Sequence, residues 1–68
     1  MTGFESGVLM ALATLNAQFD QPTMCASTIK ELDLGGIDCS ELSDFDKESL
    51  RKINKNLPYC DRLTGLGD

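Results

Sequence analysis

The chain has 68 residues, which is enough for one domain (residues 1–68) and too short for two. A net charge of −5 at pH 7 argues against a protein built to bind nucleic-acid phosphates, because that binding depends on clustered Lys and Arg. The lack of histidine and the scattered Cys25, Cys39 and Cys60 argue against a structural zinc site or a disulfide framework. One disulfide beside one free thiol remains open. Stability must therefore come from helix packing or from a second subunit.

The first predicted helix, residues 4–19, is apolar around most of its circumference. One apolar stripe is expected to face the core and consists of Phe4, Val8, Ala11, Leu12, Leu15 and Phe19. A second apolar set lies on the opposite side and consists of Leu9, Met10, Ala13 and Ala17. A helix that is apolar all round is normally buried all round. We predict that the second set meets a copy of itself in a two-fold homodimer. Coverage by the chain's own helices and tail is the alternative.

The second predicted helix covers residues 22–34. Pro22 suits the first helical position, where the missing N–H would have no partner in any case. Cys25, Ile29 and Leu32 recur at helical spacing and form one narrow apolar face. The pair Gly35-Gly36 is expected to end the helix, because glycine accepts the left-handed conformation found beyond a helix C-terminus.

The third predicted helix covers residues 44–56. Ser43 followed by Asp46 resembles a capping box, and Pro58 prevents the helix from continuing. Leu50, Ile53 and Leu57 form its expected inward face.

The remaining segments show no sustained alternation of apolar and polar residues, so no sheet is expected. Ile37, Cys39 and Leu42 in the connection, with Leu63 and Leu66 in the tail, are expected to point inward. The predicted fold is all-α: three short helices in a compact bundle with a short irregular C-terminal tail.

The apolar run of residues 7–13 superficially resembles the core of a signal peptide. Glu5 precedes it without any Lys or Arg, whereas a signal peptide begins with a positive segment. The run is also much shorter than the ~18 residues that would cross a bilayer. We therefore expect a soluble, cytoplasmic protein that does not enter a membrane.

No motif for chemistry is present. Nucleophilic side chains lack a histidine base, and Asp44 and Asp46 are better explained as acids that complement the dipole of a helix first turn. Residues 33–44 are acid-rich, but they place Gly35 and Ile37 where a calcium loop needs oxygen ligands. We expect no enzyme activity, no catalytic residue, no cofactor and no metal.

The middle of the chain, residues 31–46, contains six acidic residues and no basic residue. This block is a candidate surface for a basic protein partner, and its simpler explanation is solubility together with helix capping. The candidate partner-binding residues are Glu31, Asp33, Asp38, Glu41, Asp44 and Asp46.

An alternative function is a small DNA-binding regulator with a helix-turn-helix-like element. Its reading helix would be residues 44–56, which carry Lys47, Arg51, Lys52 and Lys55. The connection before this helix is longer than the usual turn of about 3–4 residues. The helix also begins with acidic residues where base contacts are expected. Nucleic acid is therefore the weaker choice of partner.

In size, acidity and helical content the chain resembles the small accessory proteins of bacteriophages and prophages. No residue motif carries this resemblance, and it assigns no functional residue. It implies an accessory or inhibitor protein. Together with the surplus apolar surface and the acidic block, it leads to the hypothesis of a non-enzymatic interaction protein that binds another macromolecule.

Overall fold

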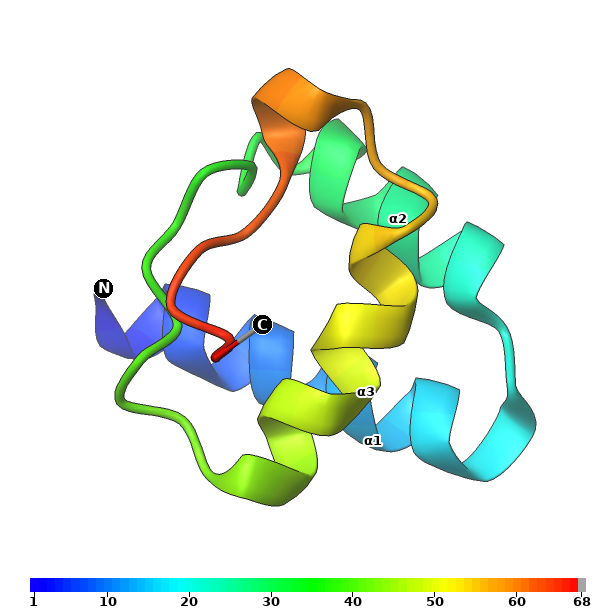
Figure 1. Cartoon of the computed structure of the whole chain (residues 1–68), viewed down its shortest axis with the longest axis horizontal. Coiled ribbons are helices and arrows are strands. Elements are labelled where there is room, and N and C mark those ends of the chain that lie inside the picture. The colour runs from blue at the N-terminus through cyan, green and yellow to red at the C-terminus, as the bar shows by residue number, and fades with distance from the viewer. Residues whose placement is uncertain (68) are drawn as a thin grey trace.

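The computed structural model describes residues 1–67 of the chain, so Asp68 of the predicted domain lies outside the described residues. Three helices and one short 3-10 turn follow each other: α1 (Gly3–Phe19), α2 (Pro22–Glu31), α3 (Asp44–Asn54) and η1 (Tyr59–Asp61). The molecule measures 24 × 24 × 23 Å along its principal axes, and α3 crosses in front of α1 (Figure 1). The predicted all-α bundle with a short tail is confirmed.

A full capping box begins α1. The backbone N–H of Glu5 donates to the Thr2 hydroxyl at 3.1 Å, and the Thr2 N–H donates to the Glu5 carboxylate at 2.7 Å. These bonds satisfy two amide groups that have no partner inside a helix. The helix ends where Asp20 takes the left-handed conformation, with φ 52°.

The end of α2 falls three residues before the predicted one. The helix stops at Glu31, and Asp33 adopts the left-handed conformation with φ 56°. The N–H of Leu34 then donates to the carbonyl of Ile29 at 2.9 Å, a bond that satisfies a helix-end carbonyl. The helix stop predicted at Gly35-Gly36 is thus wrong, because an aspartate, which tolerates this conformation, already provides it.

At the start of α3, Ser43 is the N-cap, and its hydroxyl accepts from the N–H of Asp46 at 3.2 Å. The helix ends at Asn54, slightly earlier than predicted. The chain then turns, because the N–H of Leu57 donates to the carbonyl of Asn54 at 3.1 Å. This turn starts the tail on its return path across the molecule.

The tail runs beside the connection between α2 and α3, which Figure 1 shows as the red and green segments at the left. The N–H of Cys39 donates to the carbonyl of Thr64 at 2.8 Å, and the N–H of Thr64 donates to the carbonyl of Ile37 at 3.0 Å. Between residues 1 and 67 this contact is a single isolated bridge, and no strand is formed.

Side chains of α3 also hold the tail. The Asn54 amide accepts from the N–H of Leu63 at 2.8 Å and donates to the carbonyl of the same residue at 3.1 Å. The guanidinium of Arg51 donates to the carbonyl of Leu66. The tail is therefore a fixed part of the fold, and the predicted docking of Leu63 and Leu66 is confirmed.

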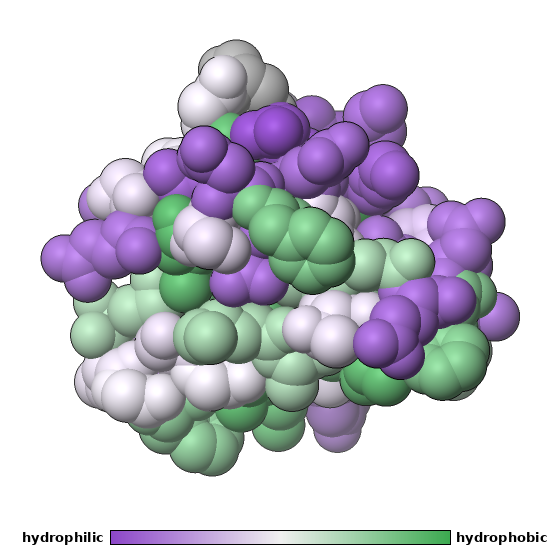
Figure 2. All heavy atoms as spheres, turned by 90° about the horizontal axis from the view of Figure 1, so that it is seen from below, coloured by the Kyte–Doolittle hydropathy of each residue, from purple (hydrophilic) through white to green (hydrophobic). Residues whose placement is uncertain are grey.

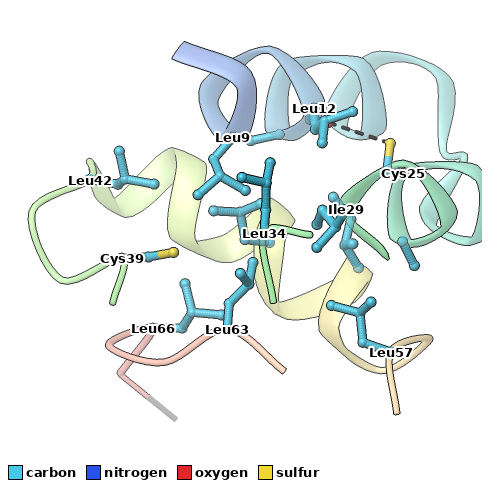
Figure 3. Close-up of a cluster of buried hydrophobic side chains, with 14 residues drawn as sticks. Leu9, Leu12, Cys25, Ile29, Leu34, Cys39, Leu42, Leu57, Leu63 and Leu66 are labelled. Carbon is cyan, nitrogen blue, oxygen red and sulfur yellow. Dashed lines mark hydrogen bonds between the residues drawn. The ribbon is translucent and has the colours of Figure 1, made fainter. Parts of the chain in front are cut away.

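Side chains from all three helices, the connection and the tail meet in one core (Figure 3). The inward positions predicted for α3, namely Leu50, Ile53 and Leu57, are all buried, and so are Cys39 and Leu42 of the connection. The complete buried apolar set is Leu9, Leu12, Ala13, Cys25, Ala26, Ile29, Leu34, Cys39, Leu42, Leu50, Ile53, Leu57, Leu63 and Leu66.

The orientation of α1 differs from the prediction. Leu9 and Ala13 are fully buried in the chain's own core, together with Leu12, while Phe4, Leu15 and Phe19 of the predicted core stripe are exposed. The buried face is centred between the two apolar sets that the sequence suggested, and it includes Asn16. Helix α3, together with the connection and the tail, supplies the cover that a second chain was expected to supply.

Candidate interaction surfaces

The predicted self-association set is split by the fold. Leu9 and Ala13 are inaccessible to a second chain because they are buried against the connection, the tail and α3. Their assignment to a dimer interface is therefore wrong. Met10 and Ala17 of the same set are exposed on α1.

The exposed apolar surface of α1 lies along its other flank, on residues that the sequence had assigned to the core. We call it the α1 stripe, and it consists of Phe4, Ala11, Leu15 and Phe19. Phe4 is 67% exposed and Phe19 is 62% exposed, although buried aromatic side chains normally dominate a core. Figure 2 looks at the α1 side of the molecule and shows hydrophobic residues and residues of intermediate hydropathy over its lower half, with hydrophilic residues gathered above.

A groove of about 260 Å³ separates the α1 stripe from α2. Leu12, Leu15 and Phe19 line its α1 wall, and Met24 and Cys25 line its α2 wall. Met24 is itself exposed, so it extends the apolar surface beyond α1. The groove was missed in the sequence because the residues of its α1 wall were assigned to the core.

The acidic block is distributed along an edge of the molecule and does not form one compact patch. In Figure 1 the connection, which carries three of the six acidic residues, runs down the left side, from the end of α2 to the start of α3. Five of the six predicted partner-binding side chains are exposed: Glu31, Asp33, Asp38, Glu41 and Asp44. The sixth, Asp46, is buried, so its assignment to a docking surface is wrong.

Asp38 has a structural task within the connection. Its carboxylate accepts from the backbone N–H of Ser40 at 3.0 Å, and this hydrogen bond lowers the pKa of Asp38 below its usual value of 3.8. The pKa of Asp38 is lower in the folded chain than in the unfolded chain. The hydrogen bond therefore stabilises the fold at pH values above the unfolded pKa, and this stabilisation is lost as pH falls through the folded pKa. A charge change at Asp38 would therefore disturb the fold as well as any docking.

The basic side chains of α3 offer a poor match to a helix-turn-helix. The connection between α2 and α3 comprises residues 32–43, far more than the usual turn of about 3–4 residues. The guanidinium of Arg51 donates to the carbonyl of Leu66 and so holds the tail. Lys52 and Lys55 are exposed, which leaves them free to act as solvated charges.

A polar cleft of about 370 Å³ lies between the C-terminal half of α1 and the N-terminal half of α3. Its lining includes Asp20, Phe45, Glu48 and Lys52, with Asn16 buried at its α1 side. Asn16 lies 33 residues before Ser49, to which it is hydrogen-bonded, so sequence spacing gave no sign of this cleft.

All three cysteines are free thiols in the structure. Burial raises the pKa of the Cys25 thiol and raises that of Cys39 to about 11, with the nearby Asp38 carboxylate as a lesser cause for Cys39. Cys60 is exposed on η1. The thiolate is the reactive form of cysteine, and a reagent must also reach the sulfur atom. Of the three thiols only Cys60 is exposed, so Cys60 is the one expected to react.

We expect iodoacetamide at mildly alkaline pH to alkylate Cys60 rapidly in the folded protein. Cys25 and Cys39 should react only when urea unfolds the chain, because both are buried and their pKa values are raised. Peptide mass spectrometry after timed labelling measures all three rates. Rapid labelling of Cys39 without denaturant would contradict the burial described for the connection.

The described residues offer no group of three or more His, Cys, Asp or Glu side chains placed to hold a metal ion. Within residues 1–67, no helix has both the length and the apolar character needed to cross a membrane. The sequence matches no protein-family model and no curated protein, and the structure matches no solved structure. The function must therefore be inferred from the chain's own surfaces.

Proposed function

We propose that this chain is a non-enzymatic interaction protein that self-associates through the α1 stripe and, as a dimer, presents its acidic residues to another protein. The observation that carries the proposal is the exposure of two phenylalanines and a leucine along one flank of a 17-residue helix. Large exposed apolar patches on small proteins generally mark contact sites.

The charge distribution permits a second copy as the occupant of the stripe. Two chains of net charge −5 repel each other, and the weakest repulsion arises where they meet through surfaces without acidic side chains. Between Glu5 and Asp20, α1 carries no charged residue. A two-fold axis across the stripe would place Phe4 of one copy near Phe19 of the other.

The available surface suits such a contact. A helix of 17 residues is about 25 Å long. A standard interface buries about 800 Å² per partner, which is about a fifth of the chain's accessible surface of 4202 Å². The stripe, the groove beside it and Met24 form a continuous surface from which that area can be drawn.

We predict that Phe19→Asp makes the protein monomeric at tens of micromolar, whereas the parent chain is dimeric. The substitution places a charge opposite Phe4 of the other copy, at an end of the proposed contact, where it loses water without gaining a partner. Because the two copies are related by a two-fold axis, the substitution occurs twice in the contact and the cost is doubled. Sedimentation equilibrium measures the dissociation constant directly.

Phe45→Asp is the matched control, because Phe45 is 60% exposed, nearly the same as Phe19, but lies on α3 away from the stripe. This variant should remain dimeric. A parent chain that stays monomeric at these concentrations would sink the proposal. Equal effects of the two substitutions would show that the stripe is not the contact.

The acidic docking surface is the second part of the proposal. Its support is the exposure of Glu31, Asp33, Glu41 and Asp44, whose charges are free to steer a basic partner. A cytoplasmic location is proposed with it, in keeping with three unpaired thiols. The phage-type accessory or inhibitor role rests on size and acidity alone.

A further inference from the structure

We propose that the cleft between α1 and α3 binds the guanidinium group of an arginine side chain from another polypeptide. The cleft lies on the α3 side of α1, away from the groove between α1 and α2. The inference therefore does not depend on self-association through the α1 stripe.

The starting observation is a buried acceptor without a donor. Asn16 is only 4% exposed, and its Oδ1 atom has no hydrogen-bond partner. A buried polar atom left in this state costs about 1–3 kcal/mol, so native proteins rarely keep one without a reason. Asn16 lines the cleft, and its Oδ1 atom has almost no accessible surface, so a donor from outside the chain would contact it only after the side chains that cover it move aside.

The orientation of the Asn16 amide is fixed by its neighbours. Its Nδ2 group donates to the carbonyl of Ser49 at 3.3 Å and to the Ser49 hydroxyl at 3.2 Å. That hydroxyl already donates to the carbonyl of Ala13 at 2.6 Å. Rotating the amide by a half-turn would set Oδ1 against the Ser49 carbonyl, two acceptors facing each other. Oδ1 is therefore the atom left without a hydrogen-bond partner.

The surroundings of Asn16 favour a cation as the donor. The carboxylates of Asp20 and Glu48 line the cleft and outnumber the single ammonium of Lys52. The C-terminal end of α1 adds its negative dipole, and no basic residue of its last turn compensates it. An anion would meet repulsion from both carboxylates, and a neutral donor would leave their charges unused.

A guanidinium fits this lining better than an ammonium. Its five N–H donors can serve more than one acceptor of the lining at once, and its flat face can stack on the exposed ring of Phe45. An ammonium has three donors and stronger hydration, so it gains less from the aromatic ring.

The chain's own arginines are engaged elsewhere. Arg51 donates to the carbonyl of Leu66, and Arg62 donates to the carbonyl of Leu57 at 3.2 Å while lying over the ring of Tyr59. A second copy of the chain carries the same two arginines in the same engagements. We therefore assign the group that enters the cleft to a different polypeptide.

The test is a titration of the whole ¹⁵N-labelled chain with N-acetyl-arginine amide, followed by NMR. We expect saturable shifts of the Asn16 side-chain amide and the Ser49 backbone amide, with a dissociation constant on the order of millimolar, as suits a single side chain. N-acetyl-citrulline amide has the same shape without the charge and should produce no saturable shift. N-acetyl-lysine amide should bind at least about threefold more weakly.

Charge-removing variants make the result specific to the cleft. Glu48→Gln and Asp20→Asn should each weaken binding about threefold or more, and asparagine preserves the left-handed backbone at position 20. Lys52→Gln should strengthen binding, because it removes the competing ammonium. Asp61→Asn, a change on η1 outside both the cleft and the acidic docking residues, is the matched control and should leave binding unchanged.

Three results would overturn the proposal: shifts of equal size with the citrulline compound, unchanged binding in both acidic variants, or no response at Asn16 and Ser49. Equal binding of the lysine compound would overturn the preference for guanidinium. Repeating the titration on Phe4→Asp, a change in the α1 stripe at the opposite end of α1 from the cleft, separates this test from self-association.

Discussion

Leu9→Ala is expected to lower the free energy of unfolding by about 3 kcal/mol, whereas Phe4→Ala on the same helix lowers it by about 0.5 kcal/mol or less. Leu9 is fully buried in the core, so its truncation removes apolar contacts and leaves a cavity. Phe4 is mostly exposed, and its truncation removes little buried surface. A domain of this length has a total stability of about 3–10 kcal/mol, so Leu9→Ala is a large loss.

Urea unfolding followed by circular dichroism measures both changes. The comparison tests the orientation of α1 directly, because the sequence pattern alone assigned Phe4 to the core and Leu9 to a second face. A larger loss for Phe4→Ala, at a concentration where the protein is monomeric, would contradict the orientation described for α1.

Gly65→Ala is expected to lower the free energy of unfolding by about 2–5 kcal/mol, which makes it the most damaging glycine substitution in the chain. Gly65 has φ +74°, a conformation that strains any residue with a side chain. The added Cβ atom would also lie 2.2 Å from the Asp38 carboxylate and 2.7 Å from the backbone nitrogen of Ser40. The tail cannot stay in place with such overlaps.

Gly36→Ala is the matched control for this prediction. Gly36 has a similar φ of +81°, but no atom lies within 4 Å of the position its Cβ would take. Gly36→Ala should therefore lower the free energy of unfolding only through backbone strain, by about 1–2 kcal/mol. The difference between the two variants in thermal or urea unfolding measures the close approach of tail and connection. Equal losses would mean that this approach is looser than described.

The sequence predicted α3 well and α1 poorly, for a physical reason. In α3 the charged residues mark the solvent side, so only one face was available for Leu50 and Ile53. In α1 almost every side is apolar, and hydrophobicity alone cannot choose between them. The choice is made by the tertiary bonds of Asn16 to Ser49, which turn a polar residue inward.

The candidate surfaces depend on which face of α1 is buried. Once Asn16 faces inward, the α1 stripe lies outside and the cleft beside α3 appears, and neither follows from the spacing of residues along the chain. The exposed acidic residues were predictable, since charged side chains seldom leave water. The burial of Asp46 was not, because a first-turn acid is normally solvated.

The bridge between Asp38 and Thr64 has a consequence for how the chain folds. The bridge joins the connection, which precedes α3 in the sequence, to the tail, which follows it. Forming the bridge therefore closes a long loop that contains all of α3, with an entropic cost of about 3 kcal/mol. Helices form from local contacts and need no such closure. Once α3 is helical it shortens the span between the two segments, which makes closure easier. We therefore expect the helices to form early, and the rate-limiting step of folding to be the closing of the tail over them.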